Sequence, residues 1–291
     1  MTQLSGAEFD GVAEVYDETR RALNAKTLRG LLAILSAHHC QSMLEIGVGT
    51  GRVAAPLIRN GINVAGVDVS RMMMEKAKSK GILNLVQADG RTPPFREESF
   101  DGVIMAHVFH LLEDPMAVID QAASLAKVGV FALLRKRDGG MGWFPFYGFG
   151  NSTGNPEIQE DDPASKFLQE RRERFRQIAE KYHWTWDRAR FRNWRREAEI
   201  LESHPPDELK VVSDVLVTET VEDRIARFEK GGFSFNRDMP AEMKKEIIQE
   251  IRSGASSFPR PLNQPRREIY QVAFWSSEGL RRQQHAVAST A

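Results

Sequence analysis

Two hydrophobic patterns alternate along the first half of the chain. Short continuous apolar runs, which are typical of buried strands, alternate with stretches in which apolar residues recur with the period of a helix. The predicted strands are residues 42–46, 63–67, 83–87, 100–105 and 128–134. The predicted helices are residues 52–58, 71–80 and 115–126, and the first forty residues are also expected to be mainly helical.

The order of these elements predicts a parallel sheet. Strands that alternate with amphipathic helices form right-handed β-α-β units, in which helices cover both faces of the sheet. Ligands bind such sheets at the carboxyl ends of the strands. Glycines follow the first predicted strand, and Asp68 and Asp89 follow the second and the third. We therefore expect a ligand site at this edge of the sheet.

The second half of the chain has a different pattern. Residues 139–150 hold five glycines and five aromatic residues and are expected to form a loop. The elements predicted beyond it are helices at residues 166–181, 221–230 and 240–253 and strands at residues 209–217 and 267–275. The predicted fold class is α/β, with a seven-stranded, mostly parallel sheet, helices on both faces and a helical cap inserted between the fifth and sixth strands. The last strand is expected to be antiparallel.

The composition excludes a disordered, collagen-like or coiled-coil protein, and the charge balance limits the expected partners. The chain is 41% hydrophobic and 27% charged, which is typical of a globular protein. Forty basic residues balance forty acidic ones, so no overall field attracts nucleic acid or an anionic membrane. The single cysteine, Cys40, cannot form an internal disulfide, which favours a reducing compartment. The acidic N-terminal stretch contains Glu8, Asp10, Glu14 and Asp17 and no apolar segment, so we expect a soluble, cytoplasmic protein without a secretory signal.

The loop after the first predicted strand, LEIGVGTG at residues 44–51, lets the backbone approach a ligand closely because glycine has no Cβ. Its GxGxG spacing differs from the GxGxxG of dinucleotide-binding folds, and no Lys-Ser or Lys-Thr pair follows, which excludes a P-loop. Asp68 ends the next strand, where a carboxylate can accept hydrogen bonds from a ribose diol. Asp89 ends the third, where a carboxylate can receive an adenine amino group. Together the three strand ends predict an adenosine site.

With these motifs, the first 135 residues or so resemble the class I S-adenosylmethionine-dependent methyltransferases that act on small molecules. The segments that carry the resemblance are LEIGVGTG (44–51), GVDVSRMMMEKAK (66–78), QADG (87–90), FDGVIMAHVFHLL (100–112) and the opening FDGVAEVYDETR (9–20). One departure is that the family usually has a Gly-Gly turn before the fifth strand, where this chain reads Leu125-Ala-Lys-Val-Gly129. That turn is remote from the expected cofactor. The resemblance implies S-adenosylmethionine as the cofactor and methyl transfer as the reaction.

The resemblance also assigns roles to individual residues around the cofactor. These are Glu45, Gly47, Gly49 and Gly51 for its methionine part, Asp68 for its ribose hydroxyls, Val69, Met73, Ala88 and Asp89 for its adenine, Tyr16 and Arg20 above it, and His107 beneath its sulfonium. The resulting domain prediction is a cofactor-binding core at residues 1–138 and an aromatic loop with a helical cap at residues 139–206. Residues 207–275 are expected to complete the core, and residues 276–291 to form a disordered tail.

The expected chemistry requires few special side chains. Methyl transfer from a sulfonium is an in-line displacement, and correct orientation of the reactants is worth ~7–11 kcal/mol in good cases. No covalent nucleophile is needed, and Cys40 lies before the first strand and is expected to be structural. His107 and His110 follow the fourth strand and are candidate general bases, the alternative being that they pack or cap. A metal site is not expected, because no third ligand accompanies the two histidines.

Residues 105–112, which follow the fourth predicted strand, argue against several classes of methyl acceptor. They lack the [DNS]PP[YFW] tetrapeptide of enzymes that methylate base amino groups, the Pro-Cys of cytosine C5 methyltransferases and the acidic metal ligands of the catechol type. The paired-glutamate hairpin of the arginine methyltransferases is also missing. We therefore expect methyl transfer to an oxygen, nitrogen or carbon atom of a small molecule. The atom, the acceptor and the oligomeric state stay open.

Two segments of the second half have alternative interpretations. The aromatic residues at 143–147 predict either a lid or apolar acceptor pocket, or packing of the inserted helices. Residues 170–197 hold ten basic and five acidic residues with aromatics between them. This stretch is either a surface for nucleic acid or another anion, or an amphipathic insertion whose arginines are solvated or paired with Glu173 and Glu180. We favour the second, because the chain is neutral and lacks a base-methylation motif.

Two other functions remain as alternatives at this point. The first is a methyltransferase that acts on RNA or protein through the arginine-rich cap. The second is a non-catalytic interaction protein that binds S-adenosylmethionine, since a fold does not fix a function.

Overall fold

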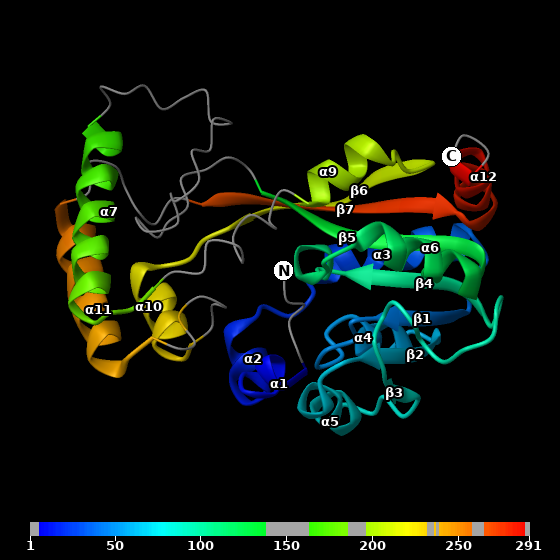
Figure 1. Ribbon diagram of the computed structural model, residues 1–291, viewed down its shortest axis with the longest axis horizontal. Coiled ribbons are helices and arrows are strands. Elements are labelled where there is room, and N and C mark those ends of the chain that lie inside the picture. The colour runs from blue at the N-terminus through cyan, green and yellow to red at the C-terminus, as the bar shows by residue number, and fades with distance from the viewer. Residues whose placement is uncertain are drawn as a thin grey trace. The chain divides into compact units, whose positions relative to one another are not determined.

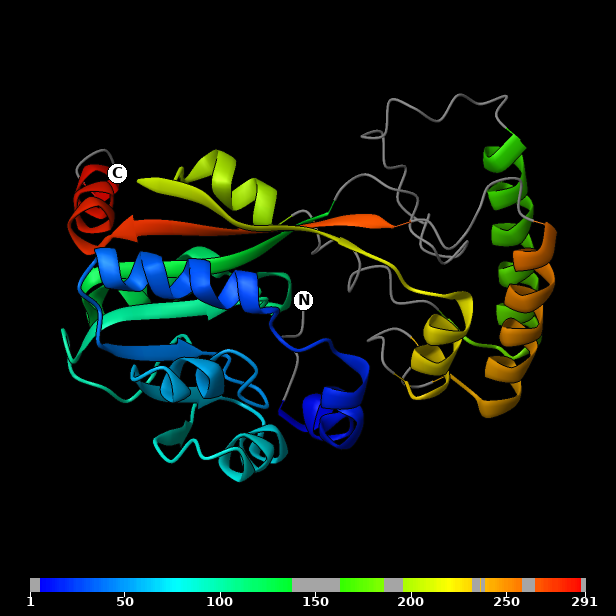
Figure 2. The same cartoon turned by 180° about the vertical axis from the view of Figure 1, so that it is seen from behind.

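A single sheet of seven strands, in the order β3-β2-β1-β4-β5-β7-β6, organises the computed structural model (Figure 1). Its strands are β1 (Ser42–Ile46), β2 (Asn63–Asp68), β3 (Leu85–Gln87), β4 (Phe100–Ala106), β5 (Ala126–Arg137), β6 (Glu208–Val217) and β7 (Arg266–Ser276). Parallel pairing joins β1 to β2 and β4, β2 to β3, and β4 to β5. The arrow of β7 runs against that of β4 in both Figure 1 and Figure 2. The predicted α/β fold with a mostly parallel sheet and an antiparallel last strand is confirmed.

The structure describes residues 6–137, 163–185, 196–231, 236, 239–257 and 265–288. The chain divides into two compact units, of which the first comprises residues 1–136, 189–214 and 269–291 and contains most of the sheet. The second comprises residues 137–188 and 215–268. The aromatic loop predicted at residues 139–150 lies outside the described residues.

The first unit also contains helices. They are α1 (Gly6–Asp10), α2 (Ala13–Thr19), α3 (Ala25–Ala37), α4 (Ala54–Arg59), α5 (Arg71–Ser79), the 3-10 turn η1 (Phe109–Leu111), α6 (Pro115–Leu125), α9 (Arg196–Ser203) and α12 (Ser277–Ala288). Of these, α1 and α2 pack against α5, and the others lie around the sheet. Side-chain caps fix where three of them begin, since Asn24, Ser70 and Asp114 accept backbone N–H groups of α3, α5 and α6. The Ser70 cap agrees with the predicted start of the helix at residue 71.

The strands are buried on both faces, which explains why they read as continuous apolar runs. Adjacent residues of β1 belong to different clusters: Met43 packs in one with Leu31 and Leu57 of α3 and α4, whereas Leu44 packs in the other with Val118 of α6. All five side chains are fully buried. Parallel sheets with helices on both faces require this double burial.

The expectation of a disordered tail from Ser276 was wrong. The structure has a helix, α12, at Ser277–Ala288. Leu280 is 2% exposed within the apolar cluster that contains α6, and the Ser277 hydroxyl donates to the carbonyl of Ala126 at 2.8 Å. Arg281 also forms an ion pair with Glu98 at 2.9 Å. Among the side chains that the structure describes, Leu280, Ser277 and Arg281 thus attach the start of this helix to the core.

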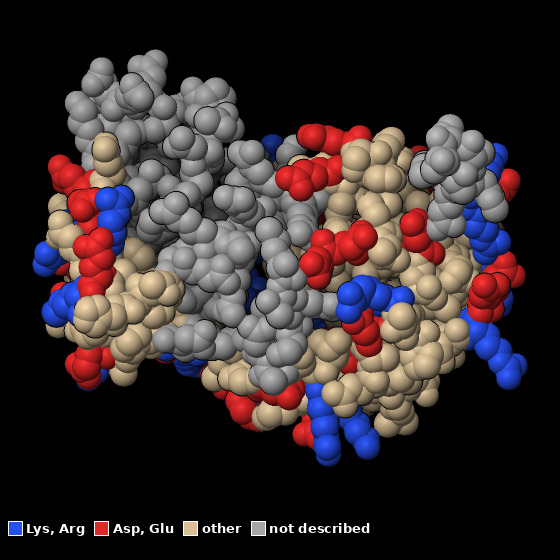
Figure 3. All heavy atoms as spheres, in the orientation of Figure 1, with Lys and Arg blue, Asp and Glu red and all other residues tan. Residues whose placement is uncertain are grey.

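The second unit consists of α7 (Pro163–Lys181), α10 (Val221–Glu229) and α11 (Ala241–Ser257), as far as it is described. The helices in this unit differ from those of the predicted cap, residues 139–206. The unit joins α7 with α10 and α11, whereas α9 belongs to the unit that contains most of the sheet. The reason is that α7 packs against α11: Arg171 and Arg174 both pair with Glu250, at 2.8 and 3.2 Å. Lys181 pairs with Glu246 at 2.7 Å. Acidic side chains therefore neutralise the basic face of α7, and Figure 3 shows the two charges intermixed there.

Ion pairing within this unit supports the amphipathic interpretation of the arginine-rich stretch, within its described part. One of the two acidic partners predicted for the arginines is found, since Arg176 pairs with Glu173 at 2.8 Å. The others come from α11, which sequence spacing could not show. Residues 186–195 of the stretch lie outside the described residues.

A close approach of α3 to β6 generates a stability prediction. A Cβ added at Gly30 would lie 2.6 Å from the Cβ of Val212 and 2.9 Å from its carbonyl oxygen. Alanine in place of glycine normally stabilises a helix by ~1 kcal/mol. Here we expect Gly30→Ala to lower the free energy of unfolding by about 1–3 kcal/mol, because the overlap forces α3 away from the strand. Urea unfolding measures the difference.

Gly11→Ala is the matched control, because no heavy atom lies within 4 Å of a Cβ added there. We expect its stability to stay within about 0.5 kcal/mol of the wild type. A Gly30→Ala protein as stable as this control would contradict the close packing of α3 on β6.

Candidate cofactor site and active site

The glycine loop after β1 has three residues in the left-handed region, Gly47, Gly49 and Gly51, with φ of +74°, +53° and +76°. An added Cβ would lie 2.4 Å from Val108 Cγ1 at Gly47 and 2.2 Å from Ile82 Cδ1 at Gly51. At Gly49 the nearest atom would be 4.0 Å away. The outer two glycines are therefore needed for packing as well as conformation, whereas the backbone at Gly49 faces open space. This is where a ligand can approach the chain closely.

Asp68 ends β2 and fixes the geometry beside that open backbone. Its Oδ2 accepts the N–H of Gly49 and its Oδ1 the N–H of Ser70, both at 2.8 Å. Burial raises the pKa of Asp68 above its ordinary value, and backbone N–H groups of Ser70, Gly49 and Val69 oppose the shift. Each carboxylate oxygen has two lone pairs, so both keep the capacity to accept a ligand hydroxyl.

Glu45 lies on β1 beneath the glycine loop and is 2% exposed. Burial raises the pKa of its carboxyl to about 8, although a backbone hydrogen bond from Ala54 and the charge of Arg52 act in the opposite direction. No residue that the structure describes forms a hydrogen bond with its Oε2. A buried polar atom without a partner costs free energy, so this site suits a ligand that brings polar groups.

The loop after β3 carries two of the predicted adenine contacts. The backbone N–H of Ala88 donates to the carbonyl of Asp68 at 3.1 Å. A Cβ added at Gly90 would lie 2.6 Å from Ile46 Cγ2, so this loop lies against the end of β1. The carboxylate of Asp89 also accepts three N–H groups of Arg91, from its backbone N at 2.9 Å, Nε at 3.1 Å and Nη2 at 2.7 Å. Sequence reasoning missed Arg91, although its position two residues after an acid is a recognisable signal.

The N-terminal helices cover the start of α5. Met73 of α5 is 2% exposed and packs against Val12 and Ala13, with Tyr16 at the edge of the same cluster. A Cβ added at Gly6 would lie 2.4 Å from the carbonyl oxygen of Val69. The guanidinium of Arg20 stacks 5.4 Å from the ring centre of Tyr16. The structure thus brings together the predicted site residues of α2 and α5, which are far apart in the sequence.

The two histidines have different environments. His107 directly follows β4, is half-buried and has a φ of +58°, which is strained for a residue other than glycine. Its ring lies 5.9 Å from that of Tyr270 on β7, in an edge-to-face arrangement. His110 lies on η1 and is exposed. Only His107 is therefore held at the carboxyl end of a strand.

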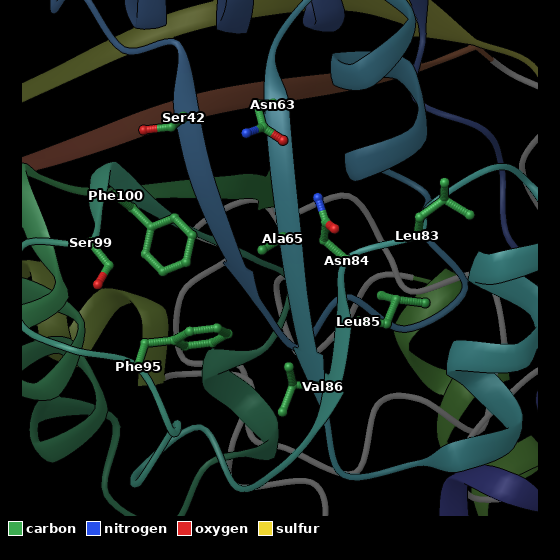
Figure 4. Close-up of a pocket in the computed structure, with 10 residues that line it drawn as sticks. All are labelled: Ser42, Asn63, Ala65, Leu83, Asn84, Leu85, Val86, Phe95, Ser99 and Phe100. Atoms are coloured by element: carbon green, nitrogen blue, oxygen red, sulfur yellow. The ribbon is translucent and has the colours of Figure 1, made fainter.

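A separate hollow of about 430 Å³ lies elsewhere on the sheet (Figure 4). Its lining includes Ser42, Asn63 and Phe100, which begin β1, β2 and β4, and the ring of Phe95, 5.1 Å from that of Phe100. The connection between β3 and β4, residues 88–99, contains no helix to cover this face. The hollow is thus at the amino ends of the strands, away from Asp68 and the glycine loop.

Other features bear on which chemistry is present. Cys40 is buried, and burial raises the pKa of its thiol to about 12, followed by a smaller effect of the Asp101 charge. The thiol is therefore structural, as predicted. Within the described part of the chain there is no group of three histidine, cysteine or acidic residues that could hold a metal. None of the described helices combines the length and the apolar character needed to cross a bilayer.

Known proteins are similar to this chain over the strands that build the candidate site. Residues 44–134 match a family model described as a methyltransferase domain. An uncharacterised protein of Methanocaldococcus jannaschii is 35% identical over 122 residues, which cover 42% of this chain and 57% of that protein. Phosphatidylethanolamine N-methyltransferase of Cereibacter sphaeroides is 26% identical over 150 residues, or 42% of this chain and 73% of that enzyme. Demethylmenaquinone methyltransferase of Tropheryma whipplei is 27% identical over 128 residues, or 42% and 54%.

The chain spans a little more than half the length of two of these three relatives. The family match runs from β1 to β5 and so includes the glycine loop, Asp68, Asp89 and His107. These segments carry the resemblance noted in the sequence, and the match confirms it. Residues 44–134 are thus similar to a methyltransferase domain over the strands that build the candidate site.

Proposed function

We propose that the protein transfers the methyl group of S-adenosylmethionine to an oxygen, nitrogen or carbon atom of a small-molecule acceptor. The observation that carries the proposal is the arrangement at the ends of β1 and β2. There the Asp68 carboxylate is held by the N–H groups of Gly49 and Ser70, next to a glycine backbone that faces open space. This arrangement fits a ribose diol beside a closely approaching ligand chain.

The remaining residues of the proposed site have complementary tasks. Glu45, with its buried Oε2, and the glycine loop receive the polar methionine part, whose ammonium group compensates the buried carboxyl. Ala88 and Asp89 bind the adenine edge, with Val69 and Met73 beside it. Tyr16 and Arg20 of the N-terminal segment cover the cofactor. These roles are the ones that the family resemblance implies. The contacts of the glycine loop, Asp68 and the N-terminal helices support them.

Catalysis then depends on position and on the exclusion of water. The bound cofactor supplies an electrophilic methyl group on a positively charged sulfur. The glycine loop and Asp68 orient it, and the covering helices exclude solvent from its adenosine part. His107 is the side chain we place beside the reacting atoms, where it can accept a proton from an acceptor that must lose one.

Two observations support a small molecule as the acceptor. In the described part of α7, Arg171, Arg174 and Lys181 are paired with acidic residues of α11, which weakens any attraction for RNA. Two relatives are named for phosphatidylethanolamine and demethylmenaquinone as methyl acceptors. We further propose a cytoplasmic location, because the only cysteine is buried and unpaired.

Calorimetry with Asp68→Ala tests the proposed function. We expect the wild-type protein to bind S-adenosylmethionine and the variant to lose at least about 30-fold in affinity, since two hydrogen bonds to a charged group are removed. A wild-type protein that does not bind the cofactor would overturn the proposal.

Asp101→Ala is the matched control for this experiment. Asp101 also accepts two backbone N–H groups, those of Gln41 and Ser42 at 3.0 and 2.8 Å, but it lies at the amino ends of the strands. Both variants are expected to lose about 1–3 kcal/mol of stability. Only Asp68→Ala should lose the cofactor, and an equal loss in both would show that general destabilisation is the cause.

Glu45→Gln tests the role of the buried carboxyl. The folded protein holds the proton of Glu45 up to a pKa of about 8, against an ordinary value of 4.5, and the unfolded chain releases it earlier. The stability contributed by the protonated group is complete below about pH 4.5 and is lost as the pH rises towards 8, by roughly 1.4 kcal/mol per pH unit.

In Glu45→Gln this pH dependence should disappear, so the variant gains stability over the wild type as the pH rises, measured by urea unfolding across that range. Its affinity for S-adenosylmethionine should fall roughly tenfold, because the amide cannot pair with an ammonium group. Parallel stability profiles of the two proteins would show that Glu45 is ionised in the folded state.

His107→Asn removes the imidazole and keeps a residue that tolerates the left-handed backbone. We expect transfer of labelled methyl groups to acceptors in a cell extract to fall at least about tenfold. The control is His39→Asn, because His39 has nearly the same φ, +55°, but is exposed and precedes β1. Unchanged transfer in His107→Asn would exclude this histidine from catalysis.

A further inference from the structure

The N-terminal helices carry three acidic residues that all contact α5 or the glycine loop. Asp10 accepts the Ser70 hydroxyl at 2.6 Å and the N–H of Met72 at 3.1 Å. Glu14 pairs with Lys76 at 2.7 Å. The third, Asp17, reaches beyond α5 to the glycine loop. These contacts attach α1 and α2 to the part of the fold that carries the proposed cofactor site.

The contacts of Asp17 form a closed network with Thr50 and Lys80. The Thr50 hydroxyl donates to Asp17 Oδ1 at 2.6 Å. The ammonium of Lys80 lies 2.6 Å from Asp17 Oδ2 and donates to the carbonyl of Thr50 at 2.8 Å. Each of the three residues therefore contacts the other two. A network of this kind restrains all its members more than a single ion pair does.

Thr50 connects this network to the glycine loop. It lies between Gly49 and Gly51, whose backbones have left-handed conformations, and it is 1% exposed. Its hydroxyl and its carbonyl are both held by the network, so its side chain and the peptide unit that joins it to Gly51 are restrained. The N–H of Gly49, one residue before, is the group that donates to Asp68.

The pair of Glu14 and Lys76 provides a comparison on the same two helices. Both helices are joined by that ion pair too, but it does not touch the glycine loop. Any role of Asp17 that is limited to attaching α2 should therefore be shared by Glu14. A role that acts through Thr50 should belong to Asp17 alone.

We propose that Asp17 is a positioning residue for cofactor binding: through Thr50 and Lys80 it couples the N-terminal helices to the glycine loop, so that the loop is ordered and the cofactor is released slowly. The inference rests on the proposed function for the identity of the ligand. The coupling itself is a property of the cofactor-free protein. Asp17 acts on the loop and does not need to touch the cofactor.

The experiment uses the full chain with four substitutions: Asp17→Ala, Thr50→Val, Thr50→Ser and Glu14→Gln. Release of labelled S-adenosylmethionine into an excess of unlabelled compound gives the dissociation rate. Hydrogen exchange of the peptide that contains residues 47–53, measured without cofactor, reports the order of the loop. Circular dichroism confirms that each variant is folded.

We expect dissociation to be roughly tenfold faster in Asp17→Ala and in Thr50→Val, because each loses a hydrogen bond to a charged group. Exchange of residues 47–53 should become faster in the same two proteins. Thr50→Ser keeps the hydroxyl and should behave as the wild type, and so should Glu14→Gln. Thr50→Val removes a contact that Asp17→Ala also removes, so a protein with both substitutions should be no worse than Asp17→Ala alone.

Equal effects of Asp17→Ala and Glu14→Gln on both measurements would overturn the proposal, because attachment of α2 alone would then explain them. Unchanged exchange in Asp17→Ala and Thr50→Val would overturn it as well. If the wild type binds no S-adenosylmethionine, the proposed function fails, and the exchange measurement still decides whether the coupling exists. Should Asp17→Ala be unfolded, Asp17→Asn, which keeps an acceptor but removes the charge, replaces it.

Discussion

The carboxylate of Asp68 is the interaction on which the rest of the site depends. It lies at the end of β2, and its two oxygens accept one N–H from the glycine loop and one from the residue that caps α5. Three elements that each reach the same edge of the sheet are thereby joined through a single side chain. The loop would otherwise have to hold three left-handed glycines by its own contacts, and Gly49 has no close neighbour to restrain it. Burial of Asp68 between these groups strengthens both hydrogen bonds and at the same time raises its pKa.

Most of the sheet could be predicted because it depends on local patterns. The predicted strand at residues 42–46 agrees with β1, Ser42–Ile46, since a strand buried on both faces leaves an uninterrupted apolar run. The cap at Ser70 was also predictable, because a hydroxyl at that position can reach the N–H three residues ahead. The acids that end strands could be located for the same reason: parallel topology brings all carboxyl ends to one edge. The family match over residues 44–134 covers this locally encoded part.

The features that were missed depend on contacts between distant residues or on a single anchor. Leu280 is buried where α12 meets the core, and a single leucine among the charged and polar residues at 277–285 gives a weak periodic signal. The grouping of α11 with α7 follows from Glu250 and Glu246, which lie more than sixty residues from their arginine and lysine partners. Glu222 of α10 in turn pairs with Arg252 of α11. The acidic residues near the N-terminus argued only against a secretory signal in the sequence. In the structure, Asp10 and Asp17 hold the first two helices against α5 and the glycine loop.

The electrostatics of the carboxylates differ between the amino ends of the strands and the carboxyl ends, where we propose that the cofactor binds. Asp101 lies at the amino ends of the strands. Burial raises its pKa, but hydrogen bonds from Gln41, Ser42 and Lys127 together lower it by more, so its ionised form stabilises the folded protein. Glu45 and Asp68 lie at the carboxyl ends, and burial raises the pKa of both. Their ionised forms therefore oppose folding in the empty protein, by the same linkage. A ligand that brings an ammonium group and hydroxyl donors removes this penalty when it binds. In the function proposed above, the free energy that these two buried carboxyl groups cost the empty protein is recovered when the cofactor binds.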